Sequence, residues 1–536
     1  MSVSNVSHKA GSTASGSSSH FTPLLSHHVA EEEADRETTD HGSTHDQNFQ
    51  RSRSFSSSSN ADARDLASTH DLLDIDNVKT EAVGLLLAAL PIVVSTMSRM
   101  LLMLPIMAAV GRLGTTALAS MNLLSIYSGL GGAVPLSGMP MALDSLCSQA
   151  FTGTKDKRLL GIYLQRTLLL CVCVQAAIYP LWWYATPICR FLGVSDDIAL
   201  TTGRMLRLYF VSVVLISFYE SLMSFLFAQG IRRAAVLAKL VCVPVGWLAI
   251  WVFLVNESTA IGIIGVPCVA IITGLCFNIF ALIFISRLGG YQCWGGWSRS
   301  ALSDLKPVTK LALSGSTITF FETVALHMID LGVLFLDAPS MAAHAILSAI
   351  STSTWALGTG FAIAACNRIG NLLGAAMLHR AQLAVYTAIG IAVVAFTVLG
   401  CFLLAKKRSI PSVFTDDPEV ADILVAHIPW AAVSGTVQGI NVALNGILRS
   451  QSRQSLIARI RVASFTIVAV PLSSVAVAVF HCRLAGLWFG YLASLIATLF
   501  AQLYYVFTTN WQLEIERCRN CISKALLRAS LVDEDG

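Results

Sequence analysis

The chain has 536 residues, of which 54% are hydrophobic and only 13% charged, and its formal net charge is +4. Because soluble proteins carry about 25% charged residues, this composition excludes a set of soluble domains and indicates an integral membrane protein. The small net charge is scattered between apolar segments, so the chain offers no basic face for a nucleic-acid partner.

Residues 1–78 are predicted to form a disordered cytosolic N-terminal tail. They are rich in Ser, Thr, His and acidic residues and have almost no apolar periodicity. A solvated tail is the simplest interpretation. Two alternatives stay open: the segment RSRSFSSSS at 51–59 suits a basic-directed kinase, and the scattered histidines could hold a metal weakly.

Apolar segments long enough to cross roughly 30 Å of hydrocarbon as helices recur from about residue 80 onward. Basic residues gather in alternate loops, so the positive-inside rule places both termini in the cytosol. The segments divide into an N-lobe at 79–290 and a C-lobe at 291–510, followed by a cytosolic C-terminal tail at 511–536. The predicted spans are 82–110, 116–141, 159–186, 200–228, 234–254, 259–286, 307–336, 341–366, 381–405, 418–447, 455–480 and 485–509.

A weak internal repeat relates the two lobes. The segment ALDSLCSQAFTG at 142–153 aligns with AACNRIGNLLGA at 364–375, and this alignment pairs Gln149 with Asn371. Because each half has an even number of spans, both halves have the same orientation in the membrane. The repeat is therefore parallel, about a pseudo-two-fold axis along the membrane normal, and a cavity between the lobes is expected, as alternating access requires.

The seventh span carries three ionisable side chains, Glu322, His327 and Asp330. Glu322 lies twelve residues beyond Lys310, or about 18 Å along a helix, which is near mid-membrane. An intramembrane carboxylate is a candidate functional residue, although a structural carboxylate satisfied by a neighbouring helix is the alternative. His327 and Asp330 are spaced i, i+3 and can pair. A proton relay through all three residues and a purely structural His–Asp pair remain equal alternatives.

Three segments resemble the signature segments of the eukaryotic, fungal- or plant-like branch of the multidrug and toxic compound extrusion (MATE) family. They are MALDSLCSQAFTGTKDKRLLGIYLQR at 141–166, RIGNLLGA at 368–375 and NGILRSQSRQ at 445–454, and the likeness covers residues 80–510. The resemblance implies an all-α polytopic membrane protein with twelve transmembrane helices in two six-helix lobes. It also implies a secondary antiporter that exports small organic compounds, cationic or amphipathic, in exchange for protons.

The resemblance implies cation and proton exchange at Glu322, which stands in the place of the family's glutamate in the seventh helix, whereas Ser314 replaces the family's proline. His327 falls where many relatives have a second glutamate. Ala349 and Gln438 stand at two further positions that are acidic in relatives. We therefore expect coupling to be concentrated on the C-lobe residues Glu322, His327 and Asp330.

Other polar and aromatic residues are candidates for the cavity and for a gate on the inner side, with packing or snorkelling roles as the alternatives. The substrate-cavity candidates are His344, Gln438, Trp355 and Phe321. The inner-side motif or gate candidates are Asp144, Gln149, Arg368, Asn371 and Arg449.

Competing functions are a lipid-linked precursor flippase of the same superfamily and a sodium-coupled exporter. The mid-membrane acidic residues argue against the flippase. No Walker sequence, nucleophile–base pair or metal cluster is found in the sequence, so we expect no ATP drive, no enzyme activity, no metal and no cofactor. The expected partners are a small-molecule substrate, protons or sodium, and the lipid bilayer. We expect a monomer in the plasma membrane or the vacuolar membrane, and the sequence does not decide between these membranes.

Overall fold

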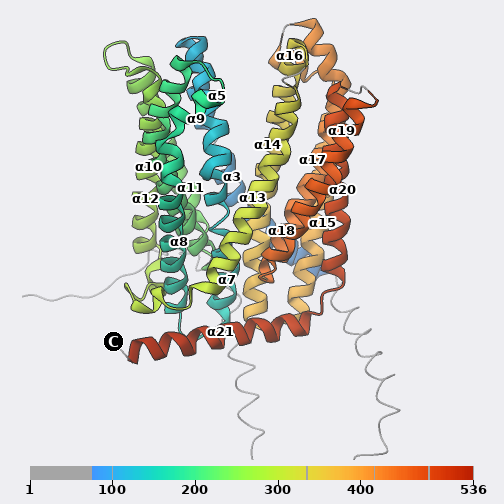
Figure 1. Ribbon diagram of the computed structural model, residues 1–536. Coiled ribbons are helices and arrows are strands. Elements are labelled where there is room, and N and C mark those ends of the chain that lie inside the picture. Colours follow the sequence, from blue (N-terminus) through green and yellow to red (C-terminus); the bar gives the residue numbers. More distant parts are fainter. Residues whose placement is uncertain (1–74, 99, 334–335, 416, 481–482, 535–536) are drawn as a thin grey trace, which may run out of the picture. The chain divides into compact units, whose positions relative to one another are not determined.

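The computed structural model describes residues 75–98, 100–333, 336–415, 417–480 and 483–534, and every regular element in these ranges is a helix (Figure 1). The predicted N-terminal tail lies outside the described residues, except that residues 75–78 already belong to the first helix. The α-helices are α3 (Ile75–Met97), α4 (Met100–Arg112), α5 (Thr115–Ser128), α6 (Val134–Ser137), α7 (Met141–Gly153), α8 (Arg158–Trp183), α9 (Ala185–Phe191), α10 (Asp196–Ala228), α11 (Arg233–Ile250), α12 (Gly265–Arg287), α13 (Leu305–Val333), α14 (Ala338–Gly374), α15 (Leu378–Ala405), α16 (Pro411–Phe414), α17 (Pro418–Ser450), α18 (Gln454–Ala463), α19 (Val470–Ala478), α20 (Arg483–Phe507) and α21 (Trp511–Glu534).

Ten helical stretches of the described chain are long and apolar enough to cross a membrane, and each coincides with a predicted span. The predicted span at 116–141 is helical but interrupted. Between α5 and α6 lies the short π-helix η1 (Gly129–Ala133), in which Gly132 has a φ of 156°. Residues with a Cβ rarely adopt that backbone conformation. The predicted span at 307–336 corresponds to α13, which is not among these ten stretches and carries Glu322, His327 and Asp330. Every predicted span therefore has a helical counterpart among the described residues.

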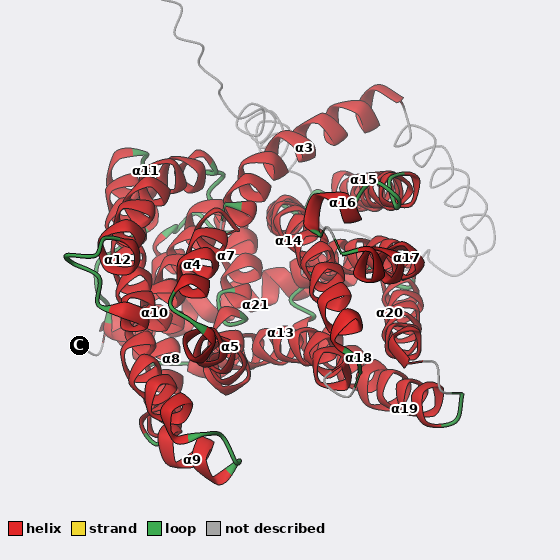
Figure 2. Cartoon of the chain, turned by 90° about the horizontal axis from the view of Figure 1, so that it is seen from above, coloured by secondary structure: helices red, strands yellow, loops and turns green. Residues whose placement is uncertain are grey.

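The helices pack as two halves, α3 to α12 and α13 to α20. In the first half α10 packs against α8 and α12, and in the second half α17 packs against α14, α15 and α20. Three helices make most of the contacts across this division, and one of them is α7, which packs against α14 and α17. Helix α3 packs mainly against α14 and α15 of the second half, and Figure 2 shows it beside them. Helix α13 contacts α6, α7 and α8 of the first half as well as α18.

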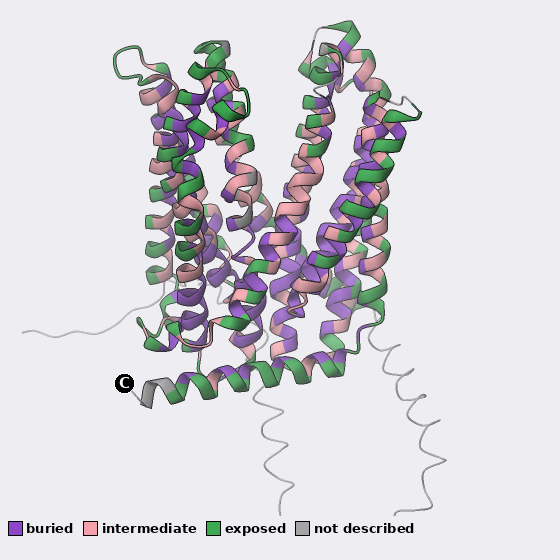
Figure 3. Ribbon diagram, in the orientation of Figure 1, coloured by how far each residue is buried: buried purple, intermediate pink, exposed green. Residues whose placement is uncertain are grey.

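Buried residues are distributed unequally along the helices (Figure 3). At one end the halves have separate cores, around Trp182 in the first half and Trp488 in the second. At the other end a single core contains residues of both halves, such as Leu160 and Leu448, together with Ile522 of α21. We call this end, at which α21 lies, the α21 end. The two halves are joined there by continuous apolar packing.

Helix α21 is amphipathic and lies across the α21 end (Figure 1). It contacts α7, α14 and α15, as well as the short 3₁₀-helix η5 (Arg299–Leu302). Its buried face contains Cys518, Ile522, Ala525 and Ala529, spaced as on one side of a helix. Burial raises the pKa of the Cys518 thiol to about 12, so this thiol stays uncharged at neutral pH. The segment predicted as a C-terminal tail is thus an ordered helix in contact with both halves.

Candidate functional site

The Glu322 carboxylate, halfway along α13, is held by three other helices. Its Oε1 lies 2.8 Å from Nη2 of Arg461 in α18, and the two side chains are only 9% and 8% exposed. Asn445 Nδ2 in α17 donates to Oε1 at 3.2 Å, and Trp355 Nε1 in α14 donates to Oε2 at 3.3 Å. The contact between Arg461 Nη2 and Glu322 Oε1 is an ion pair, but its angles are not those of a hydrogen bond. Glu322 is therefore a buried, paired carboxylate.

Arg461 and Asn445 are not among the site residues that the sequence predicts. Arg461 is an arginine inside the eleventh predicted span, and such residues nearly always pair within the membrane. The sequence therefore indicates that Arg461 pairs with an acidic residue. It does not indicate which one, because the pairing depends on the packing of α13 against α18. Asn445 is oriented by Gln502 of α20, whose Nε2 donates to Asn445 Oδ1 at 2.6 Å. Four helices thus converge on the Glu322 carboxylate.

A second polar cluster lies further along α13. The Asp330 carboxylate bridges two histidines, with Oδ2 2.8 Å from Nδ1 of His327 and Oδ1 2.7 Å from Nε2 of His344 in α14. For both contacts to be hydrogen bonds, each of these ring nitrogens carries a proton. The other nitrogen of His344, Nδ1, is buried without a partner among the described residues, as expected for a neutral ring. The Asp330 side chain is 41% exposed, so this cluster is more open than the Glu322 pair.

The two clusters are separate. No hydrogen bond or ion pair joins Glu322 to His327 or Asp330 among the contacts of the described residues, so the direct relay through all three is not assembled in this conformation. The Nε2 atom of His327 lies near Gly129 of the π-helix η1, in the first half. The three coupling candidates therefore form one isolated ion pair and one His–Asp–His cluster.

The substrate-cavity candidates lie in different surroundings. His344 belongs to the Asp330 cluster and packs edge-on against Trp488, and Trp355 donates to Glu322. The Phe321 ring packs edge-to-face on Phe465, which lies in the short π-helix η6 (Ser464–Ala469). Gln438 is buried, and its Oε1 has no partner among the described residues. Two of the four candidates thus contact coupling candidates directly.

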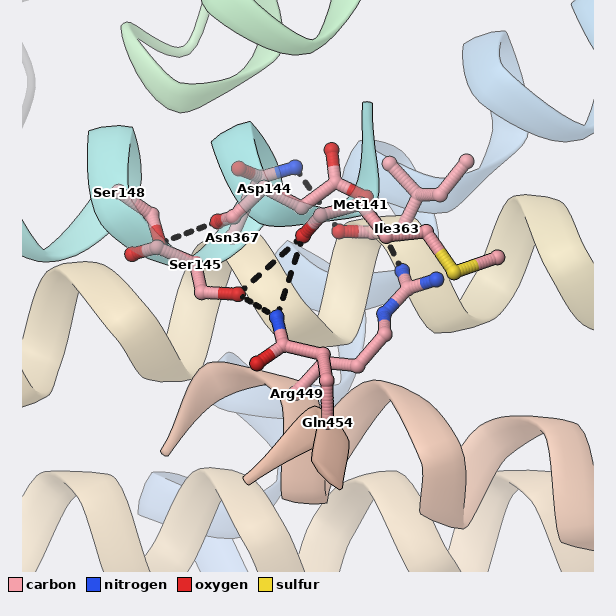
Figure 4. Close-up of polar contacts among 8 residues, drawn as sticks. All are labelled: Met141, Asp144, Ser145, Ser148, Ile363, Asn367, Arg449 and Gln454. Atoms are coloured by element: carbon pink, nitrogen blue, oxygen red, sulfur yellow. Dashed lines mark hydrogen bonds and ion pairs between the residues drawn. The ribbon is translucent and has the colours of Figure 1, made fainter. Parts of the chain in front are cut away.

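The inner-side candidates gather between the two halves near the α21 end. Asp144 Oδ2 in α7 lies 3.2 Å from Nη2 of Arg449 in α17, and both side chains are 4% exposed (Figure 4). Gln454 of α18 donates to the Met141 carbonyl at 3.3 Å and also to the Ser145 hydroxyl, and both acceptors belong to α7. The contact is therefore a buried, charged junction between the first half and the second.

Further along α7 the junction continues with hydrogen bonds to backbone carbonyls. Gln149 Nε2 donates to the Ser450 carbonyl at 2.6 Å, and Thr152 Oγ1 donates to the Asn371 carbonyl at 2.6 Å. The amide of Asn371 donates to the Ala228 carbonyl at 3.4 Å. Helix α7 thus lies between α14 and α17 and is bonded to both. The alignment of Gln149 with Asn371 from the internal repeat brings together two residues of this one junction.

Arg368 has a different partner. Its Nε and Nη2 each donate to Glu81 of α3 at 2.7 Å, a bidentate pair of the strong kind. This pair ties α14 to α3 rather than to α7. Among the described residues no group of three or more His, Cys, Asp and Glu side chains is arranged to hold a metal ion.

Comparison with known proteins gives a consistent result. The sequence model of the MatE family matches residues 91–252 and 316–475. An uncharacterized transporter of Saccharomyces cerevisiae is 26% identical over 403 residues, covering 75% of this chain but only 58% of the yeast protein. Protein DETOXIFICATION 17 of Arabidopsis thaliana is 25% identical over 420 residues, covering 78% of this chain and 87% of the plant protein. The crystal structure of the eukaryotic MATE transporter AtDTX14 superposes with a TM-score of 0.76 at 19% identity, covering 83% of this chain and 99% of that one.

Proposed function

This chain belongs to the MatE family, and from that membership we propose that it is a secondary antiporter that exports small organic compounds in exchange for protons. It is an integral multi-pass membrane transporter and not an enzyme, and its fold is the two-lobe helical fold of MATE transporters. Proton coupling, cationic or amphipathic substrates, a monomeric state and a place in the plasma or vacuolar membrane are parts of the proposal.

The observation that carries the proposal is the Asp330 carboxylate between two imidazoles inside the second half. Imidazole gains its charge between about pH 5 and 8 when unperturbed. With both rings neutral the cluster has a charge of −1, which attracts a cation. One added proton makes the cluster neutral and removes that attraction. Proton and cation then compete for one charge, which is the requirement for exchange.

Glu322 has a second part in the proposal. Its charge is offset by Arg461, so the pair is neutral and stays buried without a bound cation. Protonation of Glu322 would leave Arg461 as an unpaired buried charge, which is costly. We propose that this cost favours a rearrangement of α13 relative to α18 when a proton arrives. Trp355, which donates to Glu322, and the nearby Phe321 offer aromatic faces for a flat cation.

Transport also requires the junction around α7 to open. In this conformation the halves are joined at the α21 end by the Asp144–Arg449 pair and the bonds of Gln149 and Thr152. Each neutral hydrogen bond of the junction contributes about 0.5–1.5 kcal/mol net, and the buried Asp144–Arg449 pair and the shared apolar core add to these contacts. We propose that the cycle alternates between this state and one in which α7 has separated from α14 and α17.

Reconstituted vesicles test the proposal. Purified protein in proteoliposomes should accumulate a fluorescent organic cation when a pH gradient is imposed, and it should not do so when a sodium gradient of the same size is imposed. Uptake driven by sodium alone would replace proton coupling with sodium coupling. No uptake under either gradient, with movement of a lipid-linked probe between leaflets, would favour the flippase.

A further inference from the structure

A cavity of about 480 Å³ lies at the α21 end, away from both clusters on α13. Five helices, α7, α13, α18, α20 and α21, and the loop between α17 and α18 contribute basic and apolar side chains to its lining. Its lining contains three cationic side chains and no acidic one. The lining residues are Leu146, Pro307, Lys310, Leu311, Ser452, Arg453, Ser455, Leu456, Arg459, Tyr505 and Cys521.

The three cations differ in how they are bound. Arg453 is already paired with Glu514 of α21 and donates to Thr509. Lys310 and Arg459 are exposed, and neither has an ion-pair partner among the described residues. The Nε of Arg459 donates to the Ser455 carbonyl at 3.2 Å, which leaves its terminal nitrogens for a ligand. The cavity thus offers two uncompensated charges from adjacent helices, α13 and α18.

The surroundings of the cavity are apolar on the membrane side. Leu313, one turn beyond Lys310 on α13, is 62% exposed, and Phe507 at the end of α20 is 61% exposed. Tyr505 lines the cavity, and tyrosine is a residue type that favours the membrane–water interface. A ligand with an anionic head and apolar chains matches this arrangement, because the head meets the cations while the chains lie along the exposed side chains.

We propose that this cavity binds the phosphate-bearing headgroup of an anionic phospholipid from the leaflet at the α21 end. Basic pockets between helices on the cytoplasmic side are a recognised way to bind such headgroups. The headgroup links Lys310 on α13 to Arg459 on α18. These are the helices that carry Glu322 and Arg461, so a bound lipid stabilises the packing that forms this ion pair. The binding site itself does not depend on the proposed transport function.

Native mass spectrometry of the full-length protein tests the proposal. The protein in detergent is mixed with phosphatidylserine or, separately, with phosphatidylcholine of the same chain length. We expect retained phosphatidylserine and little phosphatidylcholine. The double variant Lys310→Gln/Arg459→Gln should weaken phosphatidylserine binding about 30-fold, because each basic residue at a membrane surface contributes a measurable share of such affinity.

The matched control is the double variant Arg233→Gln/Arg287→Gln. It removes the same charge from exposed positions at the ends of α11 and α12, outside the cavity. It should bind phosphatidylserine as the unchanged protein does. If the first double variant fails to fold, the single changes Lys310→Gln and Arg459→Gln each weaken binding by a smaller factor, and Lys310→Arg retains it.

Three outcomes would overturn the proposal. One is equal retention of phosphatidylserine and phosphatidylcholine. Another is an equal loss in the control variant, which would indicate general surface attraction. The third is displacement of phosphatidylserine by inorganic phosphate at equal concentration, which would mean that the cavity takes a free phosphate group rather than a lipid.

Discussion

At the scale of single residues, Glu322 and Asp330 lie on the same helix but are compensated in different ways. Glu322 faces a guanidinium, whose charge is fixed, whereas Asp330 faces two imidazoles, whose charge varies. A proton that arrives at the Asp330 cluster changes its net charge without leaving a buried ion unpaired. A proton that arrives at Glu322 leaves Arg461 without its counter-charge. The two groups should therefore respond differently to substitution.

The change Arg461→Gln should destabilise the protein strongly. It leaves the Glu322 carboxylate buried without a counter-charge, and breaking a buried ion pair costs about 3–5 kcal/mol. We expect a lower midpoint of thermal unfolding in detergent, and partial recovery in the double variant Arg461→Gln/Glu322→Gln, which removes both charges. The control Arg112→Gln removes an exposed arginine at the end of α4 and should change little. An unchanged midpoint for Arg461→Gln would mean that the pair adds no stability.

The change Glu322→Gln should leave membrane insertion intact but abolish transport driven by a pH gradient. Glutamine has a similar shape and keeps one of the two acceptor oxygens that Asn445 and Trp355 use, but it cannot gain or lose a proton. The Asp330 cluster is unchanged in this variant, so cation binding should still weaken as protons are added, whereas uptake should no longer follow the pH gradient. The measurement is cation binding and uptake across a pH series. Proton-driven uptake at the normal rate by this variant would remove Glu322 from the coupling mechanism and leave Asp330.

The change His327→Gln separates a coupling role from a structural one. It removes one titratable partner of Asp330 but leaves His344 in place. If the cluster exchanges protons, the pH profile of uptake should shift while folded protein is still present in the membrane. Lower expression with an unchanged pH profile in the surviving protein would support a structural His–Asp pair instead.

At the scale of elements, the contact between α13 and the start of α7 depends on glycine. Gly315 in α13 lies against the backbone of Gly138, in the turn that leads into α7, and a side chain at either glycine would overlap the backbone of the other. Helix α13 therefore reaches the first half at a point where bulk cannot be accommodated. The same helix carries both charged clusters. Movement at α13 and the position of α7 are consequently linked by direct backbone contact.

The change Gly315→Ala should lower stability, because overpacking a close contact costs about 1–3 kcal/mol. Gly390→Ala is the matched control: it is also inside a membrane helix, α15, but has open space where the Cβ would lie. Alanine is favoured over glycine in a helix by about 1 kcal/mol, so the control should be unchanged or slightly stabilised. The comparison is made by thermal unfolding in detergent, and equal midpoints for the two variants would show that the α13–α7 contact tolerates a methyl group.

At the scale of the whole molecule, the sequence predicts the membrane helices well and the long-range pairs poorly. Helices in lipid satisfy their own backbone groups, so segment length and apolarity are enough to place the spans, and the pairing of His327 with Asp330 follows from spacing within one helix. Arg461 beside Glu322, Glu81 beside Arg368 and His344 beside Asp330 each depend on which helices become neighbours. Helix α21 was predicted only as a tail, because its mean apolarity is low and its partner surface is formed by both halves.

The junction near the α21 end leads to the last prediction, in which labelling of Cys366 reports whether this junction opens. This cysteine in α14 is fully buried, and its thiol lies beside Arg449 and Asp144. If the cycle separates α7 from α14 and α17, Cys366 becomes accessible only in the opened state. We expect its labelling by a maleimide to be slow in the resting protein and faster during turnover.

Asp144→Asn removes the counter-charge of Arg449 and so weakens the closed junction. Because losing one partner of a buried pair costs about 3–5 kcal/mol, this variant should label at Cys366 at least about tenfold faster. Labelling is quantified for each cysteine by mass spectrometry of peptides. Cys189, buried in α9 at the opposite end, is the internal control and should label at the same slow rate in both proteins. If Cys366 stays unlabelled in Asp144→Asn while transport continues, substrate crosses without separation of α7 from α14, and the junction described here is a fixed part of the scaffold.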